Sequence, residues 1–289
     1  MVKKLSTLYL EARRAFMTQE DPDTAGLIAR NLLCQITGKS KEQFLADREL
    51  YAGEETCREM EKAIGRVLNG EPLAYILGCW EFYGVPLVVS PDVLIPRDDT
   101  CAVTELAIRQ ARNMDHPRVL DLCTGSGCIG IAIAMEVPEA RVTCGDISRE
   151  ALKIAEKNVA AHKLEKRITC REINACEKPW QCLGKFDIIV SNPPYITTEE
   201  MAQLPDSVKN YEPHMALHGG DDGFIFYRAI SELYREALKP GGYLCFEFGM
   251  GQGDDVCSIL QMNGYTILER TRDYNERERA VIACYNRKE

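Results

Sequence analysis

Hydrophobic side chains recur at helical spacing along the first 75 residues. The clearest stripe repeats every three or four positions, which places its members on one face of an α-helix. Further stripes run through residues 27–33 and 60–68. This pattern predicts a small N-terminal helical domain over residues 1–75. The first stripe consists of Leu5, Leu8, Tyr9, Ala12 and Phe16.

The helical pattern ends near Pro72 and Gly78, and two short strand-like runs follow it. Residues 80–85 and 87–89 are typical of a β-hairpin, which leads into residues 94–97. We therefore expect a hairpin linker over residues 76–99.

From residue 100 onward, strand-like runs alternate with helix-like stretches, which predicts a mainly parallel sheet covered on both faces. Only residues 271–279 separate the last two strands, too few for a helical crossover, so these strands should pair antiparallel. A seven-stranded, mostly parallel sheet with this ending is the Rossmann-like arrangement of class I methyltransferases, and we expect it over residues 100–289. The strand candidates are residues 118–122, 141–146, 167–173, 186–191, 243–248, 265–270 and 280–285.

Composition places the chain among ordinary globular proteins, with 45% hydrophobic and 27% charged residues in a total of 289. The 13 cysteines are odd in number and scattered, which argues against a disulfide framework or a zinc site and favours a reducing compartment. The sequence contains no apolar run that is long enough to predict a membrane span. We expect a cytoplasmic protein.

The charge and the histidines exclude further classes. With 35 basic and 44 acidic residues, the formal net charge is -9 and neither half is basic, so stable binding to nucleic acid is not expected. His214 and His218 have metal-like spacing, but Pro213 before them and the glycines after them argue against a helical ligand pair. We expect no metal site.

A glycine turn follows the first strand of the predicted sheet. Residues 121–127 read Asp-Leu-Cys-Thr-Gly-Ser-Gly and precede an apolar helix, where glycines let the backbone turn sharply and approach a ligand. With Gly130 and an acid, Asp146, at the end of the next strand, the turn also fits a dinucleotide fingerprint. A turn that only packs the helix closely on the strand is the structural alternative.

Asp121 separates the two cofactor interpretations. A fixed carboxylate at the mouth of the turn would repel a pyrophosphate but attract the ammonium of a methionine group, directly or through water. This charge favours S-adenosylmethionine over a dinucleotide. Asp146 is then expected to hold the ribose hydroxyls. The predicted cofactor-binding residues of the turn are Asp121, Cys123, Thr124, Gly125, Ser126 and Gly127.

A second motif, Asn192-Pro193-Pro194-Tyr195, follows the buried-strand pattern of residues 186–191. It falls at the carboxyl end of that strand, where open α/β sheets bind ligands. Two prolines fix their φ angles and donate no hydrogen bonds, so the carbonyl groups are held as rigid acceptors. A substrate NH₂ group could donate to the Asn192 side-chain oxygen and the Pro193 carbonyl, while Tyr195 stacks on it. The structural alternative is a rigid turn that merely ends the strand.

This arrangement suits methylation of a planar nitrogen. The lone pair of an amide nitrogen is delocalised, so aligning it with the methyl donor is the main help that a protein can give. The proton becomes acidic after methylation and can leave to water, so no general base is required. The motif alone does not separate an amide from the exocyclic amine of adenine.

Several further segments carry a resemblance to a known family. With the two motifs, they resemble the PrmC/HemK family of protein glutamine methyltransferases over nearly the whole chain. The resemblance implies that the enzyme methylates the side-chain nitrogen of the glutamine in the Gly-Gly-Gln motif of class-one peptide chain release factors. It also implies an N-terminal substrate-recognition domain, release factors as partners and S-adenosylhomocysteine as product; we expect a monomer. The segments are residues 72–78, 81–84, 94–97, 211–213, 216–217 and 219–220.

Three positions depart from the family pattern. Cys123 stands where the family usually has a glycine, and the family's Arg-Pro-Glu-Thr-Glu appears as Arg-Asp-Asp-Thr-Cys at residues 97–101. Arg97 and Thr100 are therefore only candidates, Arg97 for substrate binding. The third departure is Asn174, which stands where the family usually has an aspartate near the adenine of the cofactor and could still hydrogen-bond to the adenine.

Asn192, which matches the family, is also expected to contact the cofactor.

Two other functions compete with this interpretation. An adenine amino-methyltransferase acting on DNA or RNA would use the same Asn-Pro-Pro-Tyr geometry, but the acidic charge and the lack of a basic insert disfavour it. A noncatalytic module that binds nucleotides or proteins would not need both motifs.

Overall fold

The computed structural model describes residues 2–286 and divides the chain into two compact units. The first extends to Cys79 and also includes Asp206–Tyr211. The second comprises Trp80–Pro205 and the chain from Glu212 onward. The expected hairpin linker therefore falls mostly within the second unit.

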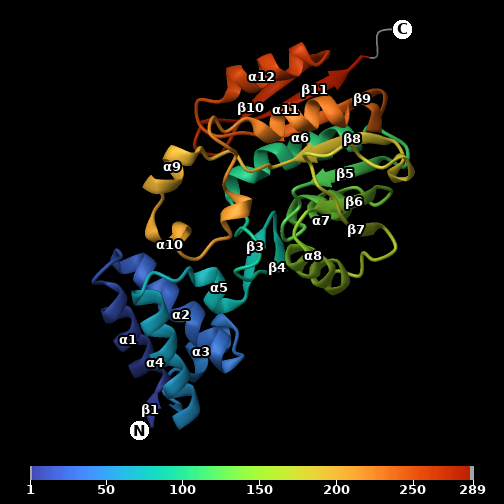
Figure 1. Cartoon of the computed structure of the whole chain (residues 1–289). Helices are drawn as coiled ribbons and strands as arrows, with labels where there is room; N and C mark the ends of the chain where they lie inside the picture. The colour runs from blue at the N-terminus through green and yellow to red at the C-terminus, as the bar shows by residue number, and fades with distance from the viewer. Residues whose placement is uncertain (1, 287–289) are drawn as a thin grey trace. The chain divides into compact units, whose positions relative to one another are not determined.

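The first unit is a small helical body (Figure 1). Its longest helices pack around one apolar core, to which the predicted stripe contributes Leu5, Leu8, Ala12 and Phe16. Its helices are α1 (Leu5–Phe16), α2 (Pro22–Thr37), α3 (Lys41–Asp47), α4 (Glu54–Leu68), α5 (Leu73–Leu77) and α10 (Asp206–Lys209), and its strands are β1 (Lys3–Lys4) and β2 (Tyr51–Ala52).

Local sequence fixes both ends of helix α2 and the start of helix α3. The Asp21 side chain accepts hydrogen bonds from the backbone N–H groups of Asp23 and Thr24, with Pro22 at the first helical position. Gly38 then ends α2 in the left-handed conformation. Ser40 and Gln43 form a reciprocal capping box at the start of α3.

The second unit is built on a seven-stranded sheet within the described residues, with strand order β10-β11-β9-β8-β5-β6-β7. Strands β7, β6, β5, β8 and β9 are parallel, whereas β11 pairs antiparallel with both β9 and β10. The predicted Rossmann-like sheet and its final antiparallel pair are confirmed. The strands are β5 (Arg118–Leu122), β6 (Arg141–Asp146), β7 (Ile168–Glu172), β8 (Phe186–Ser191), β9 (Leu238–Glu247), β10 (Tyr265–Arg272) and β11 (Glu278–Tyr285).

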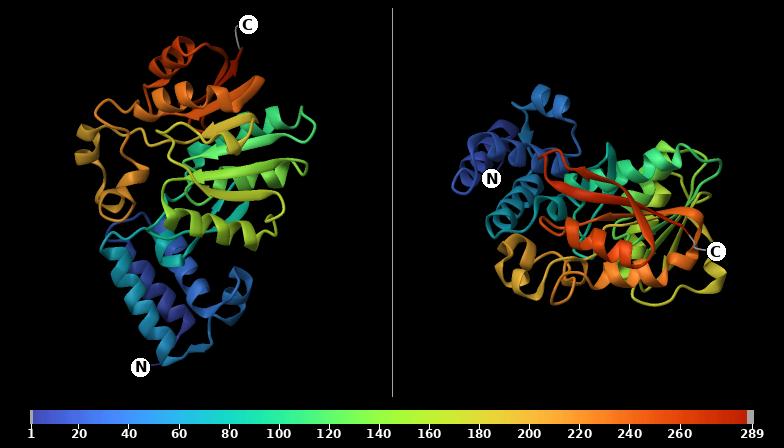
Figure 2. Two further views of the ribbon diagram at one scale, coloured as in Figure 1. Left: turned by 45° about the vertical axis from the view of Figure 1, so that its right-hand side comes forward. Right: turned by 90° about the horizontal axis from the view of Figure 1, so that it is seen from above.

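Helices cover both faces of this sheet (Figures 1 and 2). Helices α6, α7 and α8 pack on one face, and α11 and α12 pack on the other. The helices of the second unit are α6 (Cys101–Ala111), α7 (Cys128–Glu136), α8 (Arg149–Ala161), α9 (Thr198–Gln203), α11 (Ile225–Leu233) and α12 (Gly253–Met262), with short 3₁₀ turns at Asp98–Thr100, Gln181–Leu183, His214–Ala216 and Arg235–Ala237.

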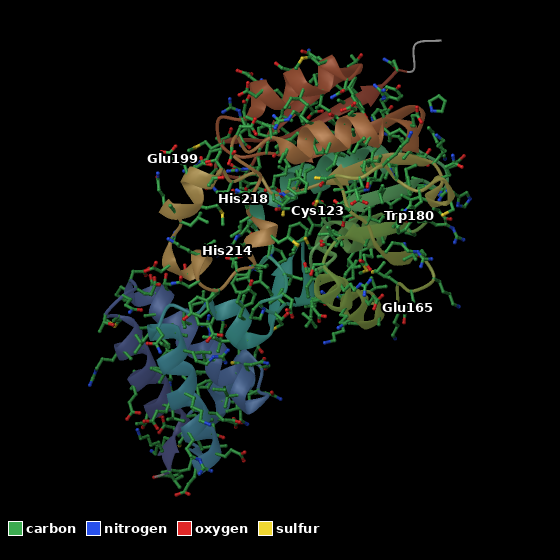
Figure 3. All side chains as sticks on the ribbon, in the orientation of Figure 1. Cys123, Glu165, Trp180, Glu199, His214 and His218 are labelled. Atoms are coloured by element: carbon green, nitrogen blue, oxygen red, sulfur yellow. The ribbon has the colours of Figure 1, made fainter. Side chains whose placement is uncertain are left out.

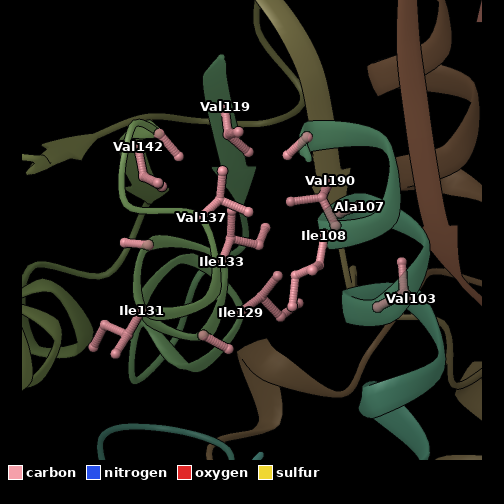
Figure 4. Packing of buried hydrophobic residues seen from close by; sticks show 14 of the residues in the cluster. Val103, Ala107, Ile108, Val119, Ile129, Ile131, Ile133, Val137, Val142 and Val190 are labelled. Atoms are coloured by element: carbon pink, nitrogen blue, oxygen red, sulfur yellow. The ribbon is translucent and has the colours of Figure 1, made fainter. Parts of the chain in front are cut away.

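Successive residues of the central strands enter opposite cores, because side chains alternate along a strand. Val119 packs with α6 and α7, for example, whereas Leu120 packs with α11 and α12. Figure 4 shows the first of these cores, where Ile108 of α6 and Ile133 of α7 meet Val119 and Val190 of the sheet. Burial on both faces explains why apolar residues occupy neighbouring positions in these strands instead of alternating with polar ones.

The predicted hairpin is present as β3 (Cys79–Phe82) and β4 (Val85–Val88), a two-stranded sheet. Its loop consists of Tyr83 and Gly84, whose φ angles are 52° and 73°. Two positive φ angles match the turn whose twist fits a two-residue hairpin. In the part of the chain that the structure describes, no helix has the length and apolarity to cross a membrane.

Gly130 of α7 is required for the close approach of this helix to the sheet. A Cβ atom at residue 130 would lie 2.6 Å from the Cys144 sulfur and 3.1 Å from the Asp121 Oδ2 atom. We expect Gly130→Ala to lower the free energy of unfolding by about 1–3 kcal/mol because the core is overpacked. Urea unfolding followed by circular dichroism measures this loss.

Two comparisons control that measurement. Gly65→Ala in α4 should instead be neutral or stabilising by about 0.5–1 kcal/mol, since no described atom lies within 4 Å of its added Cβ. Cys144→Ala should restore part of the stability of Gly130→Ala. Equal stability of Gly130→Ala and the wild type would refute the packing role.

Candidate active site

The carboxyl ends of the parallel strands meet at one edge of the sheet and frame a cavity of about 440 Å³. Its walls come from the segments that follow β5, β6, β7 and β8, together with residues 91–97 and 213–216. The cavity is thus where open α/β sheets bind ligands. Of the predicted site residues, it brings together Arg97, Cys123, Thr124, Gly125, Ser126, Asp146, Asn174, Asn192 and Pro194.

The glycine turn after β5 lies along this cavity. Cys123, Gly125 and Gly127 have φ angles of 58°, 53° and 82°, which bend the chain sharply between β5 and α7. A Cβ atom at Gly125 would meet no described atom within 4 Å, so the backbone faces open space there. At Gly127 the added atom would lie 3.3 Å from Ala155, so this glycine allows close packing of α8. Gly127 itself is not part of the cavity wall.

Asp121 lies behind the turn rather than in the cavity wall. Its buried carboxylate accepts hydrogen bonds from the Thr124 hydroxyl at 2.5 Å and the Gly130 N–H at 3.0 Å. Its other oxygen, Oδ1, is buried without a hydrogen-bond partner among the described residues. Burial raises the pKa of Asp121 to about 7, although both hydrogen bonds oppose the rise.

Asp146 ends β6 with its carboxylate at the cavity. The side chain accepts from the N–H groups of Gly125 and Ser148, both at 2.9 Å. It therefore joins the glycine turn to the loop before α8. Burial raises the pKa of Asp146, and these backbone hydrogen bonds counteract the rise.

Asn174 follows β7 and also lines the cavity. Its side-chain oxygen accepts from the Cys176 N–H at 3.0 Å, and its NH₂ group donates to Glu177 at 2.9 Å. Its backbone carbonyl accepts from the buried Tyr234 hydroxyl at 3.0 Å. These contacts hold the loop between β7 and β8 at the cavity.

The Asn-Pro-Pro-Tyr segment leaves β8 beside the glycine turn, since Ser191 of β8 pairs with Leu122 of β5. Asn192 and Pro194 line the cavity. Asn192 donates its side-chain N–H to the Thr100 hydroxyl at 3.1 Å.

Pro193 and Tyr195 lie outside the cavity wall. The Tyr195 ring packs against the core beneath α11 and α12, and burial raises the pKa of its hydroxyl. The expected stacking of a substrate on Tyr195 stays a prediction.

Gly219 and Gln252 also contact the Asn-Pro-Pro-Tyr segment. A Cβ at Gly219 would lie 2.6 Å from the Tyr195 Cα, so only glycine allows that approach. The Gln252 side chain donates to the Tyr195 carbonyl at 3.1 Å. Ile196 and His218 form a short parallel bridge beside it. The family-like glycine at residue 219 therefore supports the backbone of the motif.

Arg97 lies in the cavity wall, but its guanidinium forms an ion pair with Glu212. The Glu212 carboxylate is 2% exposed and also accepts from the Ile95 N–H at 3.3 Å. Glu212 thus fixes residues 95–97 against the start of the 213–216 wall. In the sequence, Tyr-Glu-Pro at residues 211–213 stands out only through its resemblance to the family, and no local pattern predicts the role of Glu212.

Glu247, at the end of β9, was also missed from the sequence. It is 2% exposed, and burial raises its pKa to about 7, whereas the neighbouring polar side chain of Thr100 and the positive charge of Arg279 act in the opposite direction. Arg279 lies nearby and forms ion pairs with Asp99 at 3.0 Å and Asp273 at 3.4 Å. A buried charged cluster therefore lies beside the Asn-Pro-Pro-Tyr segment.

The two histidines with metal-like spacing lie between β8 and α11, where Figure 3 labels them with Cys123. The His218 ring bonds to the Thr198 hydroxyl at 2.9 Å, and that hydroxyl donates to Asp221 at 2.8 Å. Within residues 2–286, no group of three or more His, Cys, Asp or Glu side chains is arranged to hold a metal ion.

Similarity to known proteins covers nearly the whole chain. Residues 98–206 match the methyltransferase small domain, and residues 8–78 match the PrmC N-terminal domain. A release factor glutamine methyltransferase of Clostridium acetobutylicum is 36% identical, with 87% of this chain and 88% of that protein covered. Another, of Geobacter sulfurreducens, is 36% identical with 94% of both chains covered. The solved structure of a methyltransferase from Pyrococcus furiosus shares the fold, with a TM-score of 0.52, 16% identity and coverage of 78% and 99%.

The seven-stranded sheet with a cavity at its edge is the Rossmann-like fold of S-adenosylmethionine-dependent enzymes. With the match to the methyltransferase small domain, it places the protein among the Rossmann-like methyltransferases. Within that class, the chain belongs to the release factor glutamine methyltransferase family.

Titration of Asp121 should make stability depend on pH. Its folded-state pKa of about 7 lies above the ordinary 3.8, so the folded protein binds the proton more tightly than the unfolded chain does. The stabilising effect of that proton is complete below the ordinary pKa and is lost as pH rises through about 7. From about pH 8 to pH 6, the wild type should gain about 1.4 kcal/mol relative to Asp121→Asn.

Urea unfolding at a series of pH values measures this difference. Glu247 titrates in both proteins, so its effect cancels in the comparison. A wild-type and Asp121→Asn pair with parallel pH profiles would show that Asp121 does not titrate in this range.

Proposed function

We propose that this protein uses S-adenosylmethionine to methylate the side-chain nitrogen of a glutamine in class-one peptide chain release factors. The target is the glutamine of their Gly-Gly-Gln motif, and the enzyme acts in the cytosol, where translation ends. One observation carries the proposal: a single cavity is lined by both the glycine turn after β5 and the Asn192 segment after β8. Membership of the family supports the choice of substrate.

The residues around the glycine turn fit the cofactor. Gly125 leaves open space where a side chain would project, and Asp121 has a buried oxygen with no partner among the described residues. When bound, S-adenosylmethionine supplies an electrophilic methyl group on a positively charged sulfur. Asp146 would bind the ribose hydroxyls, Asn174 would adjoin the adenine, and the negative charge of Asp121 would favour the ammonium group.

Substrate alignment is the work of the Asn192 segment. The Asn192 side-chain oxygen and the Pro193 carbonyl would accept the two hydrogens of the glutamine NH₂ group. These hydrogen bonds would stop the amide from rotating and direct the nitrogen lone pair across the cavity. Fixing this orientation before the reaction is the main contribution of the protein. The proton leaves after methylation, when the amide is acidic, so water suffices as its acceptor.

The first test concerns Asp146. Asp146→Ala should weaken binding of S-adenosylmethionine by about 10- to 100-fold, because charge-assisted hydrogen bonds to the ribose are lost. Isothermal titration calorimetry measures the Kd. Asp146→Asn keeps an acceptor for the Gly125 N–H, so its Kd should lie between those of the wild type and Asp146→Ala. Glu156→Ala, on the exposed face of α8, serves as the control. Unchanged affinity in a folded Asp146→Ala protein would remove this residue from the cofactor site.

The second test concerns Asn192. Asn192→Ala should slow single-turnover methylation of a purified release factor by about a hundred- to thousandfold, the usual effect of losing one such hydrogen bond. Asn192→Asp keeps an acceptor and should retain more activity than Ala. Mass spectrometry of the modified peptide identifies the methylated residue, and thermal melts confirm folding.

Two outcomes would contradict the proposal. A wild-type rate in folded Asn192→Ala would rule out this alignment mechanism. Methylation of adenine in DNA or RNA, with no methylation of release factor, would establish the competing substrate.

A further inference from the structure

Gln252, immediately before α12, has a side-chain amide whose orientation is fixed by two backbone partners. Its oxygen accepts from the Gly249 N–H at 2.9 Å, and its NH₂ group donates to the Tyr195 carbonyl at 3.1 Å. A backbone N–H can only donate and a carbonyl can only accept, so a flipped amide would lose both hydrogen bonds. Gln252 therefore joins the loop after β9 to the last residue of the Asn-Pro-Pro-Tyr segment.

Two glycines pack closely around this amide. A Cβ atom at Gly223 would lie 2.7 Å from the Gln252 Nε2 atom and 2.5 Å from the Tyr195 carbonyl oxygen. A Cβ atom at Gly249 would lie 2.9 Å from the Gln252 Oε1 atom. A side chain at either position would displace the amide, so these glycines leave room for both of its hydrogen bonds.

The Asn-Pro-Pro-Tyr segment is too stiff to absorb a movement at its end. Proline fixes φ at residues 193 and 194. A residue that precedes proline is confined to extended conformations, which restricts Asn192 and Pro193 as well. The start of the segment is anchored in the sheet, because Ser191 pairs with β5 on one side and β9 on the other. A shift of the Tyr195 carbonyl would therefore reach the Pro193 carbonyl two residues away.

We propose that Gln252 is a positioning residue that holds the Tyr195 carbonyl and thereby fixes the Pro193 carbonyl, the second acceptor for the substrate NH₂ group. This inference rests on the proposed function for the role of the Pro193 carbonyl. Gln252 is not part of the cavity wall, so it need not touch cofactor or substrate. It acts through the backbone of the segment.

Single-turnover methylation at pH 8, with saturating cofactor and release factor, measures this role. Gln252→Met is similar in size but makes neither hydrogen bond, and it should slow the maximal rate by about tenfold. Gln252→Glu keeps an acceptor for the Gly249 N–H but has no proton to donate to the Tyr195 carbonyl, so it should be at least as slow. A role confined to Gly249 would instead leave Gln252→Glu at the wild-type rate. Gln261→Met, at an exposed position of α12, is the matched control.

A second readout needs neither cofactor nor substrate. The side-chain NH₂ resonance of Gln252, assigned by its loss in Gln252→Met, should exchange with solvent at least several-fold more slowly than that of Gln261. The Gly249 N–H should be protected from exchange in the wild type and in Gln252→Glu, and it should lose protection in Gln252→Met. Thermal melts establish that each variant is folded.

The outcomes distinguish this inference from the proposed function. A wild-type maximal rate in folded Gln252→Met or Gln252→Glu would overturn the positioning role, and so would a rate loss that disappears at saturating substrate. Exchange at Gln252 as fast as at Gln261 would remove the hydrogen bond on which the role depends. A wild-type protein that methylates no release factor would overturn the proposed function, while the exchange measurement would still decide whether Gln252 holds the Tyr195 carbonyl.

Discussion

The buried carboxylate of Asp121 is the constraint on which the geometry of the site depends. Burying a carboxylate is unfavourable unless it is hydrogen-bonded. One of its oxygens accepts from Thr124 in the turn and from Gly130 in α7, which joins strand, turn and helix at one atom. Gly130 allows this because a side chain there would collide with Cys144. The turn between them is consequently bent through residues with positive φ, and its backbone faces the cavity.

The sequence pattern predicted the sheet well because each strand carries its own local signal. Strand-like runs predicted β5, β6 and β8 with the bounds observed, and the short spacing of residues 271–279 predicted the antiparallel pair. Glu247 could not be found in this way, since it ends an apolar strand and its partners come from distant segments. The pairing of Arg97 with Glu212 joins residues 115 positions apart. Such contacts depend on how the elements pack, and no local pattern in the sequence encodes them.

Cys123 stands where the family usually has a glycine, yet its backbone still adopts a conformation that glycine favours. Its φ of 58° is left-handed, a conformation that glycine adopts freely but that costs a residue with a Cβ atom about 1–2 kcal/mol. The strain falls in the cavity wall, where Cys123 is held between the end of β5 and Thr124. Strained residues of this kind persist where the surrounding structure fixes them, and they gather at functional sites.

The helical unit is not a simple N-terminal module, because it is built from two separate stretches of the chain. Residues 206–211 belong to that unit although they lie between β8 and β9, and the Tyr211 hydroxyl donates to the Asn69 carbonyl at 3.0 Å. The polypeptide therefore crosses between units at residues 79–80, 205–206 and 211–212. Deleting the first 79 residues would strip this inserted segment of the helices it packs with. A chimera that exchanges recognition units between relatives would consequently need two grafts, one at the N-terminus and one in the middle of the catalytic unit.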